Sequence, residues 1–525
     1  MKPTAKLFKS LAAAALLPFL IAAVFFYIRY HVLTIPVTII YTNDFHGHIL
    51  PDKNAEGTGG AAAIAAFVKS VRRKDPDALF LDAGDFFQGT PQSDLSKGRN
   101  TILVMNRLGY DAAAVGNHEF DFGLKNLGSL AAEAQFPFLS ANIFYSATNS
   151  APPFIKPYII KEVKGVRIAI FGLTSERTPD MSIPENVKGL RFEDARDISR
   201  NLVGELRKKA DVIVALSHLG LEKSENLKSG KEAAWHGDIA LASEVPDIDI
   251  IIGGHTHTHE PGLKVGKTFI VQTAGLGRSV GKLTIRLSRK SGKPLLISNS
   301  IVKMSAKKTG EDPVMKDFVG SISSEITRQL ATVIGEVTED IKRSDGKQSP
   351  LGFFIADIIR QKSGAMISFN NRGGVRADFK KGHVTLGDVY MVSPFDNTIV
   401  TMKLSGAQIR AIVGKSIANT SSNGAAVLDA SGLRLTARQR QPSDEKADID
   451  VSTKNKNGRQ VFVPLDDKKY YTVATNSFLA SGGDGFVEFT KGTDIRDTGI
   501  NIRAAITDFI KNAKKIKPPS ARQNG

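Results

Sequence analysis

The sequence predicts an α/β protein whose two domains are joined by a helix, and three observations support this prediction. From Ile35 onward, short runs rich in β-branched residues alternate with stretches that have helical spacing. Strands that alternate with helices are typical of layered α/β domains. The charged, glycine-poor stretch 312–338 predicts a linking helix, because Asp312 and Pro313 are typical of a helix start. Separate loop signals in the second half predict a further domain.

The predicted strands of the first half are short and apolar. They cover Val37–Tyr41, Ala78–Leu81, Ala112–Val115, Val166–Phe171, Val212–Leu216, Ile248–Ile252 and Phe269–Gln272. Between them, residues 61–73 and 100–108 have the apolar spacing of helices that bury one face. This order of elements predicts a first domain at 35–311.

The second half is divided by glycine-rich loops at 371–374 and 482–485 and by a polar insert at 441–458. Such clusters mark turns between apolar runs, and they predict a second domain at 339–510. The last segment, 511–525, has four lysines before a Pro-Pro pair and is predicted to be disordered.

The N-terminal segment 1–34 differs in kind from the rest of the chain. Three lysines precede an uncharged apolar run at 11–28, which Arg29 closes. This pattern predicts a signal anchor or a signal peptide, and the lack of a small-x-small cleavage motif favours the anchor. The heavier positive charge on the N-terminal side places the body on the periplasmic or extracellular face of a membrane. Secretion after cleavage is the alternative.

Composition excludes several classes of chemistry. The 525 residues contain no cysteine, which rules out disulfides, a thiolate nucleophile and a cysteine-ligated zinc. The formal charge of +17 would suit an anionic membrane surface or small anionic substrates. We find no recognition-helix, RNA-binding or zinc-finger pattern, so we expect no nucleic-acid partner.

Potential metal ligands follow five of the predicted strands directly. They are Asp44, His46, Asp85, Asn117, His218, His255 and His257. Because the carboxyl ends of strands in such sheets line the ligand crevice, we expect these side chains to meet at one edge. Two divalent cations about 3.5–4 Å apart need a shared carboxylate and further nitrogen or oxygen ligands. Without thiolates, the set suits zinc, manganese, iron or cobalt.

The ordered motifs resemble those of the calcineurin-like metallophosphoesterases. A single Asp-x-His is weak evidence, whereas Gly-Asn-His-Glu at 116–119 behind an apolar strand is specific. From about Thr38 to Phe489, the chain resembles the bacterial 5′-nucleotidase and UDP-sugar hydrolase family. This resemblance implies a four-layer α/β/β/α metallophosphoesterase domain and a C-terminal α/β substrate-binding domain.

The resemblance also assigns roles to the candidate ligands. It implies that Asp85 bridges two metals. The first metal would take Asp44, His46, Asp85 and His257, and the second would take Asp85, Asn117, His218 and His255. His118 and Asp121 resemble the family's catalytic dyad, and we expect Asn117 beside them to take part in catalysis. In this dyad the carboxylate would fix the imidazole tautomer.

In the second half, the resemblance implies a nucleotide-binding site. Asn371 and Arg376 fit the family's Asn-x-Gly-Gly-x-Arg loop, where the arginine would hold phosphate or ribose oxygens. Phe478 matches an aromatic that stacks on the base, and Asp484 matches a carboxylate that accepts from ribose hydroxyls.

Two positions of the substrate-binding half depart from the family pattern. Lys347 stands where arginine is common, and Val427 stands where a second aromatic usually completes the base sandwich. Lysine is a point charge and cannot make a forked contact, and the loss of one stacking wall would weaken selection for nucleosides.

The sequence therefore predicts a two-metal hydrolase of phosphate esters. The leading hypothesis is a 5′-nucleotidase that releases phosphate from nucleoside monophosphates, with UDP-sugars or 2′,3′-cyclic nucleotides as additional candidate substrates. Two alternatives stay open. One is a related metallohydrolase of a non-nucleotide substrate, such as a thiosulfohydrolase or a general phosphodiesterase, and the other is a non-catalytic surface binding protein.

Overall fold

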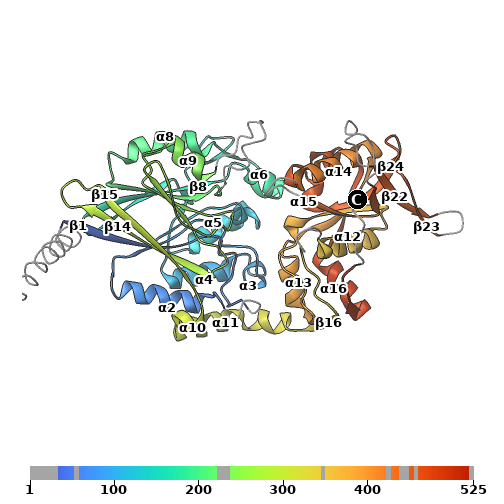
Figure 1. Ribbon diagram of the computed structural model, residues 1–525, viewed down its shortest axis with the longest axis horizontal. Helices are drawn as coiled ribbons and strands as arrows, with labels where there is room; N and C mark the ends of the chain where they lie inside the picture. Colours follow the sequence, from blue (N-terminus) through green and yellow to red (C-terminus); the bar gives the residue numbers. More distant parts are fainter. Residues whose placement is uncertain are drawn as a thin grey trace, which may run out of the picture.

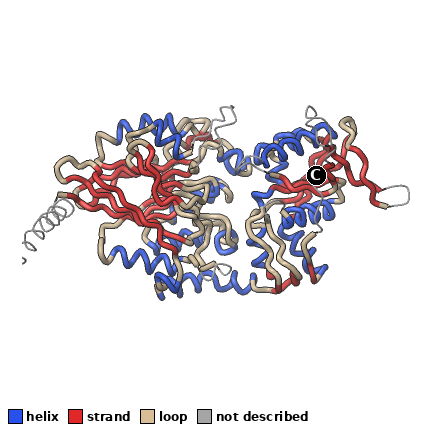
Figure 2. The backbone as a smooth tube through the Cα atoms, viewed as in Figure 1, coloured by secondary structure: helices blue, strands red, loops and turns tan. Residues whose placement is uncertain are grey.

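The protein forms two domains that lie side by side and are connected along one edge by helix α11, Pro313–Leu330 (Figures 1 and 2). This description rests on a computed structural model. The structure describes residues 33–52, 58–221, 237–344, 349–420, 427–436, 448–454 and 459–519. The predicted signal segment 1–34 lies outside these ranges except for its last two residues. Within them, no helix has the length and apolar character needed to cross a membrane.

Two sheets packed face to face form the centre of the N-terminal domain. The first has the order β15-β14-β1-β2-β3-β4-β6, with bounds Pro294–Lys303, Ser279–Ser288, Thr34–Thr42, Leu79–Asp82, Ala112–Ala114, Phe138–Leu139 and Ile155–Lys156. The second has the order β12-β13-β11-β10-β8-β7, with bounds Glu260–Val265, Thr268–Gln272, Ile250–Gly253, Val212–His218, Val166–Thr174 and Tyr158–Val163. β5 (Ile143–Tyr145) and β9 (Leu190–Phe192) form a separate pair.

Helices cover the outer faces of both sheets. Those of this domain are α2 (Ala61–Arg72), α3 (Pro91–Asp94), α4 (Arg99–Leu108), η3 (His118–Phe120), α5 (Leu124–Glu133), α6 (Thr178–Met181), α7 (Pro184–Val187), α8 (Ala195–Leu206), α9 (Asp238–Glu244) and α10 (Ala306–Thr309). In Figure 1, α8 and α9 lie over the second sheet and α2, α4 and α11 lie under the first. The arrangement is the expected α/β/β/α stack.

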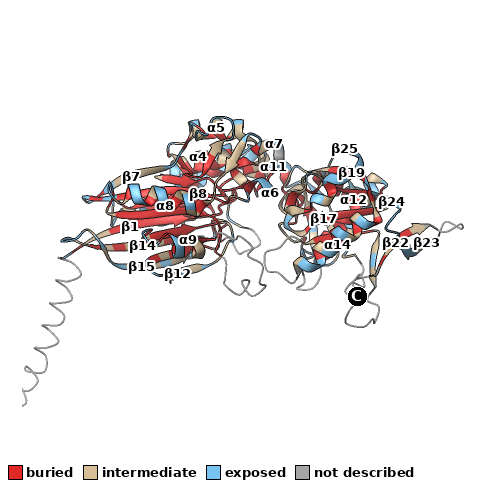
Figure 3. Ribbon diagram, turned by 90° about the horizontal axis from the view of Figure 1, so that it is seen from above, coloured by how far each residue is buried: buried red, intermediate tan, exposed pale blue. Residues whose placement is uncertain are grey.

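The alternation of side chains along each strand produces these layers. Ile40 of β1 belongs to the core shared with α2, whereas its neighbour Ile39 belongs to the core between the two sheets, together with Val214 of β10. Successive strand residues point to opposite faces, so a strand that is apolar at every position must be covered on both sides. Figure 3 shows the strands of this domain as mostly buried.

The C-terminal domain is a smaller α/β unit. Its sheets have the orders β20-β17-β24-β19-β25, β18-β16-β26 and β21-β22-β23. The strands are β16 (Val333–Val337), β17 (Ile367–Asn371), β18 (Gly382–Thr385), β19 (Thr398–Ser405), β20 (Leu428–Ser431), β21 (Leu433–Thr436), β22 (Asp448–Lys454), β23 (Gln460–Pro464), β24 (Tyr470–Asn476), β25 (Thr493–Asn501) and β26 (Lys515–Ile516). The helices are α12 (Pro350–Ser363), η5 (Arg372–Gly374), α13 (Leu386–Val392), α14 (Gly406–Thr420), α15 (Ser477–Ala480), η6 (Gly483–Gly485), η7 (Val487–Lys491) and α16 (Ile502–Ala513).

All seven predicted strands and both predicted helices of the first half are confirmed, with shifts of a few residues at their ends. The linking helix is shorter than predicted, because 312–338 contains a helix and then a strand. The Asp312 side chain accepts from the backbone N–H of Met315 and caps α11, as expected for a helix start. After Leu330 the chain enters β16, whose Val337 is fully buried in the core of the C-terminal domain.

The prediction of disorder from residue 511 was wrong for the first part of that segment. Helix α16 continues to Ala513, and β26 pairs in parallel with β16. The physical reason is Ile516, which is only 5% exposed and belongs to the same core as Val337. A single apolar residue among lysines therefore fixes the chain end, while residues 520–525 lie outside the described part.

Candidate metal centre

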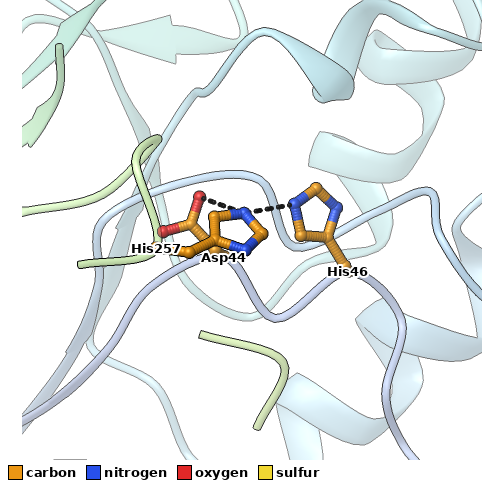
Figure 4. Close-up of side chains that lie close together, drawn as sticks. All are labelled: Asp44, His46 and His257. Atoms are coloured by element: carbon orange, nitrogen blue, oxygen red, sulfur yellow. Dashed lines mark hydrogen bonds and ion pairs between the residues drawn. The ribbon is translucent and has the colours of Figure 1, made fainter. Parts of the chain in front are cut away.

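The candidate ligands lie at the carboxyl ends of β1, β2, β3, β10 and β11, where His218 ends β10 and the others lie in the following loops. The first three strands are parallel neighbours in one sheet and the last two are parallel neighbours in the other. Their carboxyl ends meet, so residues more than 200 positions apart in sequence come together. Two groups of ligand atoms each lie within 4.8 Å of one another, Asp44 with His46 and His257, and Asp85 with His218 and His255. Figure 4 shows the first group.

Asp85 lies between the two groups. Its Oδ2 is 3.0 Å from His218 Nε2 and 3.8 Å from His46 Nε2. In the first group, His257 Nε2 is 3.4 Å from Asp44 Oδ1 and 3.2 Å from His46 Nε2 (Figure 4). A carboxylate shared between two clusters of imidazoles and carboxylates is the arrangement that a pair of divalent cations requires.

Asn117 adds an amide oxygen to the second group. Its Oδ1 is 3.1 Å from His255 Nδ1, and the residue is almost fully buried. The structure thus places all seven predicted ligands at one edge of the two sheets.

The backbone at the site is held in an unfavourable conformation. Five of the seven candidate ligands have positive φ, with 49° at Asp44 and at His46, 57° at Asp85, 74° at His255 and 50° at His257. Residues other than glycine rarely adopt this region, and each instance costs about 1 kcal/mol or more. Such strain persists only where surrounding structure enforces it, and it is common at functional sites.

Backbone carbonyls fix the orientation of two imidazoles. The Nδ1 of His46 lies 2.8 Å from the carbonyl oxygen of Gln88, and the Nδ1 of His218 lies 2.8 Å from that of Ala83. A carbonyl can only accept, so each Nδ1 carries the proton. Each Nε2 is therefore the nitrogen available to a cation, which is how outer hydrogen bonds usually orient metal-binding histidines.

The buried polar atoms of the site fit a cation better than they fit one another. His218 Nε2 is buried and makes no hydrogen bond, although Asp85 Oδ2 is close, because the geometry is poor. Burial lowers the pKa of His46, His255 and His257, so these rings are neutral, which is the form that binds metal. Burial would also lower the pKa of His218, but Asp85 raises it to about 10. A cation at Nε2 would take the place of that proton.

The predicted dyad is assembled beside both groups, with the His118 ring 5.2 Å from that of His46. The Nδ1 of His118 donates to Asp121 Oδ2 at 2.6 Å, and the His118 backbone N–H donates to Asp85 Oδ1 at 2.9 Å. Burial would lower the pKa of His118, yet the carboxylates of Asp121 and Asp85 raise it to about 9. The imidazole is therefore protonated near neutral pH, and it lines the same cavity as the metal candidates.

The sequence interpretation gave no role to Glu119, which organises the loops around Asp85. Its Oε2 accepts from the backbone N–H groups of Gly116 at 2.7 Å and Asp85 at 2.9 Å. Its Oε1 accepts from those of Phe86 at 2.9 Å and Phe87 at 3.1 Å. The side chain is fully buried. Only its place within Gly-Asn-His-Glu signalled importance, because its four donors come together through the tertiary fold.

The predicted substrate residues face the metal candidates across the two domains. A cavity of about 780 Å³ is lined by His46, Asp85, Asn117, His118, His255 and His257 from one side and by Asn371, Arg376, Phe478 and Asp484 from the other. The C-terminal domain reaches the dyad directly, since the ring of Phe395 lies 6.0 Å from that of His118 and 6.0 Å from the Arg376 guanidinium carbon.

Asparagines hold the carboxylate of the substrate half in place. Asn371 Nδ2 donates to Asp484 Oδ2 at 2.9 Å, and Asn476 Nδ2 donates to Asn371 Oδ1 at 2.9 Å. Burial raises the pKa of Asp484 despite the bond from Asn371. Lys347, the remaining predicted substrate residue, lies outside the described residues.

Comparison with known proteins matches both halves of the chain. Residues 37–259 match the family of calcineurin-like phosphoesterases, and residues 333–491 match the 5′-nucleotidase C-terminal domain. The chain belongs to this two-domain phosphoesterase family. The resemblance found in the sequence is thereby confirmed, as is the predicted fold class.

Three relatives illustrate how far the similarity extends. The phosphoesterase is 29% identical to protein UshA of Yersinia enterocolitica over 537 residues, which covers 93% of each chain. It is 30% identical over 528 residues to the trifunctional nucleotide phosphoesterase protein YfkN of Bacillus subtilis, covering 92% of this chain but only 34% of YfkN. Among solved structures, the 5′-nucleotidase precursor of Thermus thermophilus superposes with a TM-score of 0.79 at 29% identity, covering 93% of this chain and 98% of the other.

Membership of this family makes the chain a metal-dependent phosphoester hydrolase. The two candidate ligand groups are consistent with the divalent cations that the fold implies.

Proposed function

We propose that the phosphoesterase is a 5′-nucleotidase that hydrolyses nucleoside monophosphates to nucleosides and phosphate. The observation that carries this proposal is the single cavity lined by both the metal candidates and the C-terminal residues Asn371, Arg376, Phe478 and Asp484. A nucleotide would use both surfaces at once, with its phosphate at the metal candidates and its nucleoside at the C-terminal residues. Relatives named as 5′-nucleotidases support the same reading.

In this proposal the seven candidate ligands hold two divalent cations, bridged by Asp85. Such cations, when bound, stabilise charge on the phosphoryl oxygens and lower the pKa of water. The oxygen and imidazole ligands favour zinc, manganese, iron or cobalt.

The protein's own groups then handle the leaving group and the charge that develops. Hydrolysis breaks the bond from phosphorus to the ester oxygen, and that oxygen must leave with a proton. Protonated His118, oriented by Asp121 at 2.6 Å, is placed to supply that proton or to stabilise the phosphoryl oxygens. Arg376 contributes a guanidinium for the phosphate or the ribose, and Asp484 accepts from ribose hydroxyls.

A substrate panel tests the proposal. AMP, UDP-glucose, 2′,3′-cyclic AMP and 4-nitrophenyl phosphate would be compared on protein reconstituted with each of the four metals. The readout is phosphate release for the two monoesters, formation of UMP and glucose 1-phosphate for UDP-glucose, and ring opening to the AMP monoester for the cyclic nucleotide. We expect AMP to have the highest kcat/KM and activity to vanish on chelation. Asp85→Asn should lower kcat by orders of magnitude, whereas Asp317→Asn, at an exposed site on α11, should not.

The panel also decides between the proposal and its rivals. Equal rates on all esters would favour a general phosphodiesterase, for which the absence of a second aromatic at Val427 is the specific motivation. Metal binding without turnover of any ester would leave two alternatives, a thiosulfohydrolase and a non-catalytic binding protein.

We further propose that segment 1–34 exports the enzyme and anchors it to the inner membrane with the body in the periplasm. The support is the basic start and apolar run of the sequence. Fractionation with N-terminal sequencing tests this. An intact N-terminus in the membrane fraction supports the anchor, and a shortened soluble form supports cleavage.

A further inference from the structure

The second wall of the predicted nucleobase site does not come from the position where the family usually supplies it. Val427 stands there, and neither it nor Leu428 is among the described residues that line the cavity. The Leu428 side chain is instead buried in the C-terminal core. The neighbouring segments 421–426 and 437–447, outside the described part, contain no aromatic residue in the sequence.

Phe478 offers only one face to a ligand. A Cβ atom added at Gly483 would lie 2.6 Å from the ring carbons of Phe478, so the Gly483 backbone packs directly on the ring. The half-buried ring also lines the cavity. A base stacked on the free face of Phe478 would therefore need another surface on its far side to leave water.

The N-terminal domain places two apolar side chains at this cavity. Helix α6 packs against η6, the turn that contains Gly483 and Asp484 (Figure 1). Met181 ends α6, Ile183 precedes α7, and both line the cavity together with Phe478. Ile183 is 40% exposed. A large apolar side chain exposed at a cavity of mixed polarity commonly marks a ligand contact.

Two contacts fix this segment relative to the chemistry. Asn186 Nδ2 donates to the backbone carbonyl of Asp121 at 2.8 Å, and the Asn186 backbone N–H donates to that of Ile183 at 2.9 Å. The apolar pair is thereby tied to the loop that carries the catalytic dyad. The distance of this apolar pair from the reacting phosphate therefore depends on the N-terminal domain alone. The position of Phe478 depends on the C-terminal domain.

We propose that Met181 and Ile183 form the second wall of the nucleobase site, so that the base is held between an aliphatic surface of one domain and Phe478 of the other. This inference rests on the proposed nucleotidase function. Two apolar walls without hydrogen-bonding groups should accept purines and pyrimidines alike, because every base has an apolar face. The nucleoside, and not the phosphate alone, would then require both domains.

The test compares AMP with ribose 5-phosphate, which has the same phosphate ester but no base. In the double variant Met181→Ala/Ile183→Ala, we expect the ratio of kcat/KM for AMP to that for ribose 5-phosphate to fall roughly tenfold or more, as for loss of a stacking or apolar contact. Met181→Leu/Ile183→Leu should retain most of the ratio. Ile160→Ala is a matched control, because Ile160 is 39% exposed on β7 and does not line the cavity.

The outcomes separate the inference from the function on which it rests. A wild-type enzyme that prefers AMP, together with a double variant that keeps this preference, would overturn the second wall alone. A wild-type enzyme without any preference for AMP would overturn both. If the double variant unfolds, as judged by circular dichroism, the single variants Met181→Ala and Ile183→Ala carry the same comparison, and an unchanged ratio in both contradicts the proposal.

Discussion

Glu119 gives the sharpest prediction about what holds the metal centre together. Its two oxygens accept four backbone N–H bonds of 2.7–3.1 Å from residues 85–87 and Gly116, and its side chain is fully buried. Those donors belong to the loops after β2 and β3, which are also joined by the bond from the His118 backbone N–H to Asp85 Oδ1. We therefore expect Glu119 to stabilise the fold and to position Asp85, without touching a substrate.

The size of the effect follows from the number of donors. A buried N–H left without an acceptor costs about 1–3 kcal/mol. Glu119→Gln replaces one carboxylate oxygen with a donor, which affects two N–H groups, so we expect a loss of roughly 2–6 kcal/mol in the free energy of unfolding. Glu119→Ala removes both acceptor oxygens and leaves four N–H groups without a partner, and its loss should approach the ~5–15 kcal/mol that stabilises a typical domain. Water that enters the space would reduce both values.

Urea unfolding of the full chain, followed by circular dichroism, measures this loss. A second readout is the metal concentration needed for half-maximal activity. Asp85 has a strained φ of 57°, and the hydrogen bond from its backbone N–H to Glu119 helps to hold it there. When that bond is lost, Asp85 is less well placed to bind metal. Loss of an outer contact to a metal ligand typically costs 10–100-fold in metal affinity or activity, and we expect that range for Glu119→Gln.

The control is Glu325→Gln on α11, where the carboxylate is 60% exposed, pairs with Arg328 and accepts from Gln329. An exposed pair of this kind contributes about 0–1 kcal/mol, so this variant should unfold like the wild type. If Glu119→Gln also unfolds at the wild-type urea concentration and needs no more metal, the reasoning about the four donors is refuted.

Three further predictions concern the dyad, the glycine beside Asp85 and the metals. His118→Ala should lower kcat by roughly 10²–10⁴-fold with little change in unfolding temperature, and Asp121→Asn should lower it less; a full rate of phosphate release in His118→Ala would contradict the dyad. Gly116→Ala should abolish most activity, because the added Cβ would lie 2.2 Å from Asp85 Oδ1. The control is Gly204→Ala on α8, where an added Cβ has no other atom within 4 Å. This variant should keep full activity in the assay and be as stable as the wild type, or more stable, in calorimetry. Chelation should lower the unfolding temperature, since a cation at 100 times its Kd adds about 2.7 kcal/mol of stability, and calorimetry that shows no shift would count against both metal sites.

The metal centre could be predicted from the sequence because its ligands obey a local rule. Each one follows an apolar strand within a few residues, and parallel strands bring their carboxyl ends to one edge whatever the details of packing. The dyad was equally accessible, because His118 and Asp121 are three residues apart in one turn. No knowledge of distant contacts was needed for either.

Features that depend on distant pairing could not be obtained in this way. The sequence predicts residues 333–337 as the end of a helix. In the structure they form a strand, because the strand at 515–516 pairs with them. Glu119 looks like one more charged residue of a motif, since three of its four donors lie more than 30 positions away. In both cases the deciding partner is set by the tertiary fold and leaves no periodic signal in the sequence.

The site therefore divides into two parts that are stabilised in different ways. The candidate metal half is built from strained loops, buried carboxylates and buried imidazoles of one domain, and bound cations would offset the cost of burying these groups together. In the proposed nucleobase site, one wall is Phe478 of one domain and the other wall is the α6–α7 segment of the other domain. Phosphate chemistry should consequently tolerate changes at Met181 or Ile183, whereas the choice of nucleoside should not. On this proposal, substitutions in the α6–α7 segment of this chain change the preference for the nucleoside without any change to the candidate metal ligands.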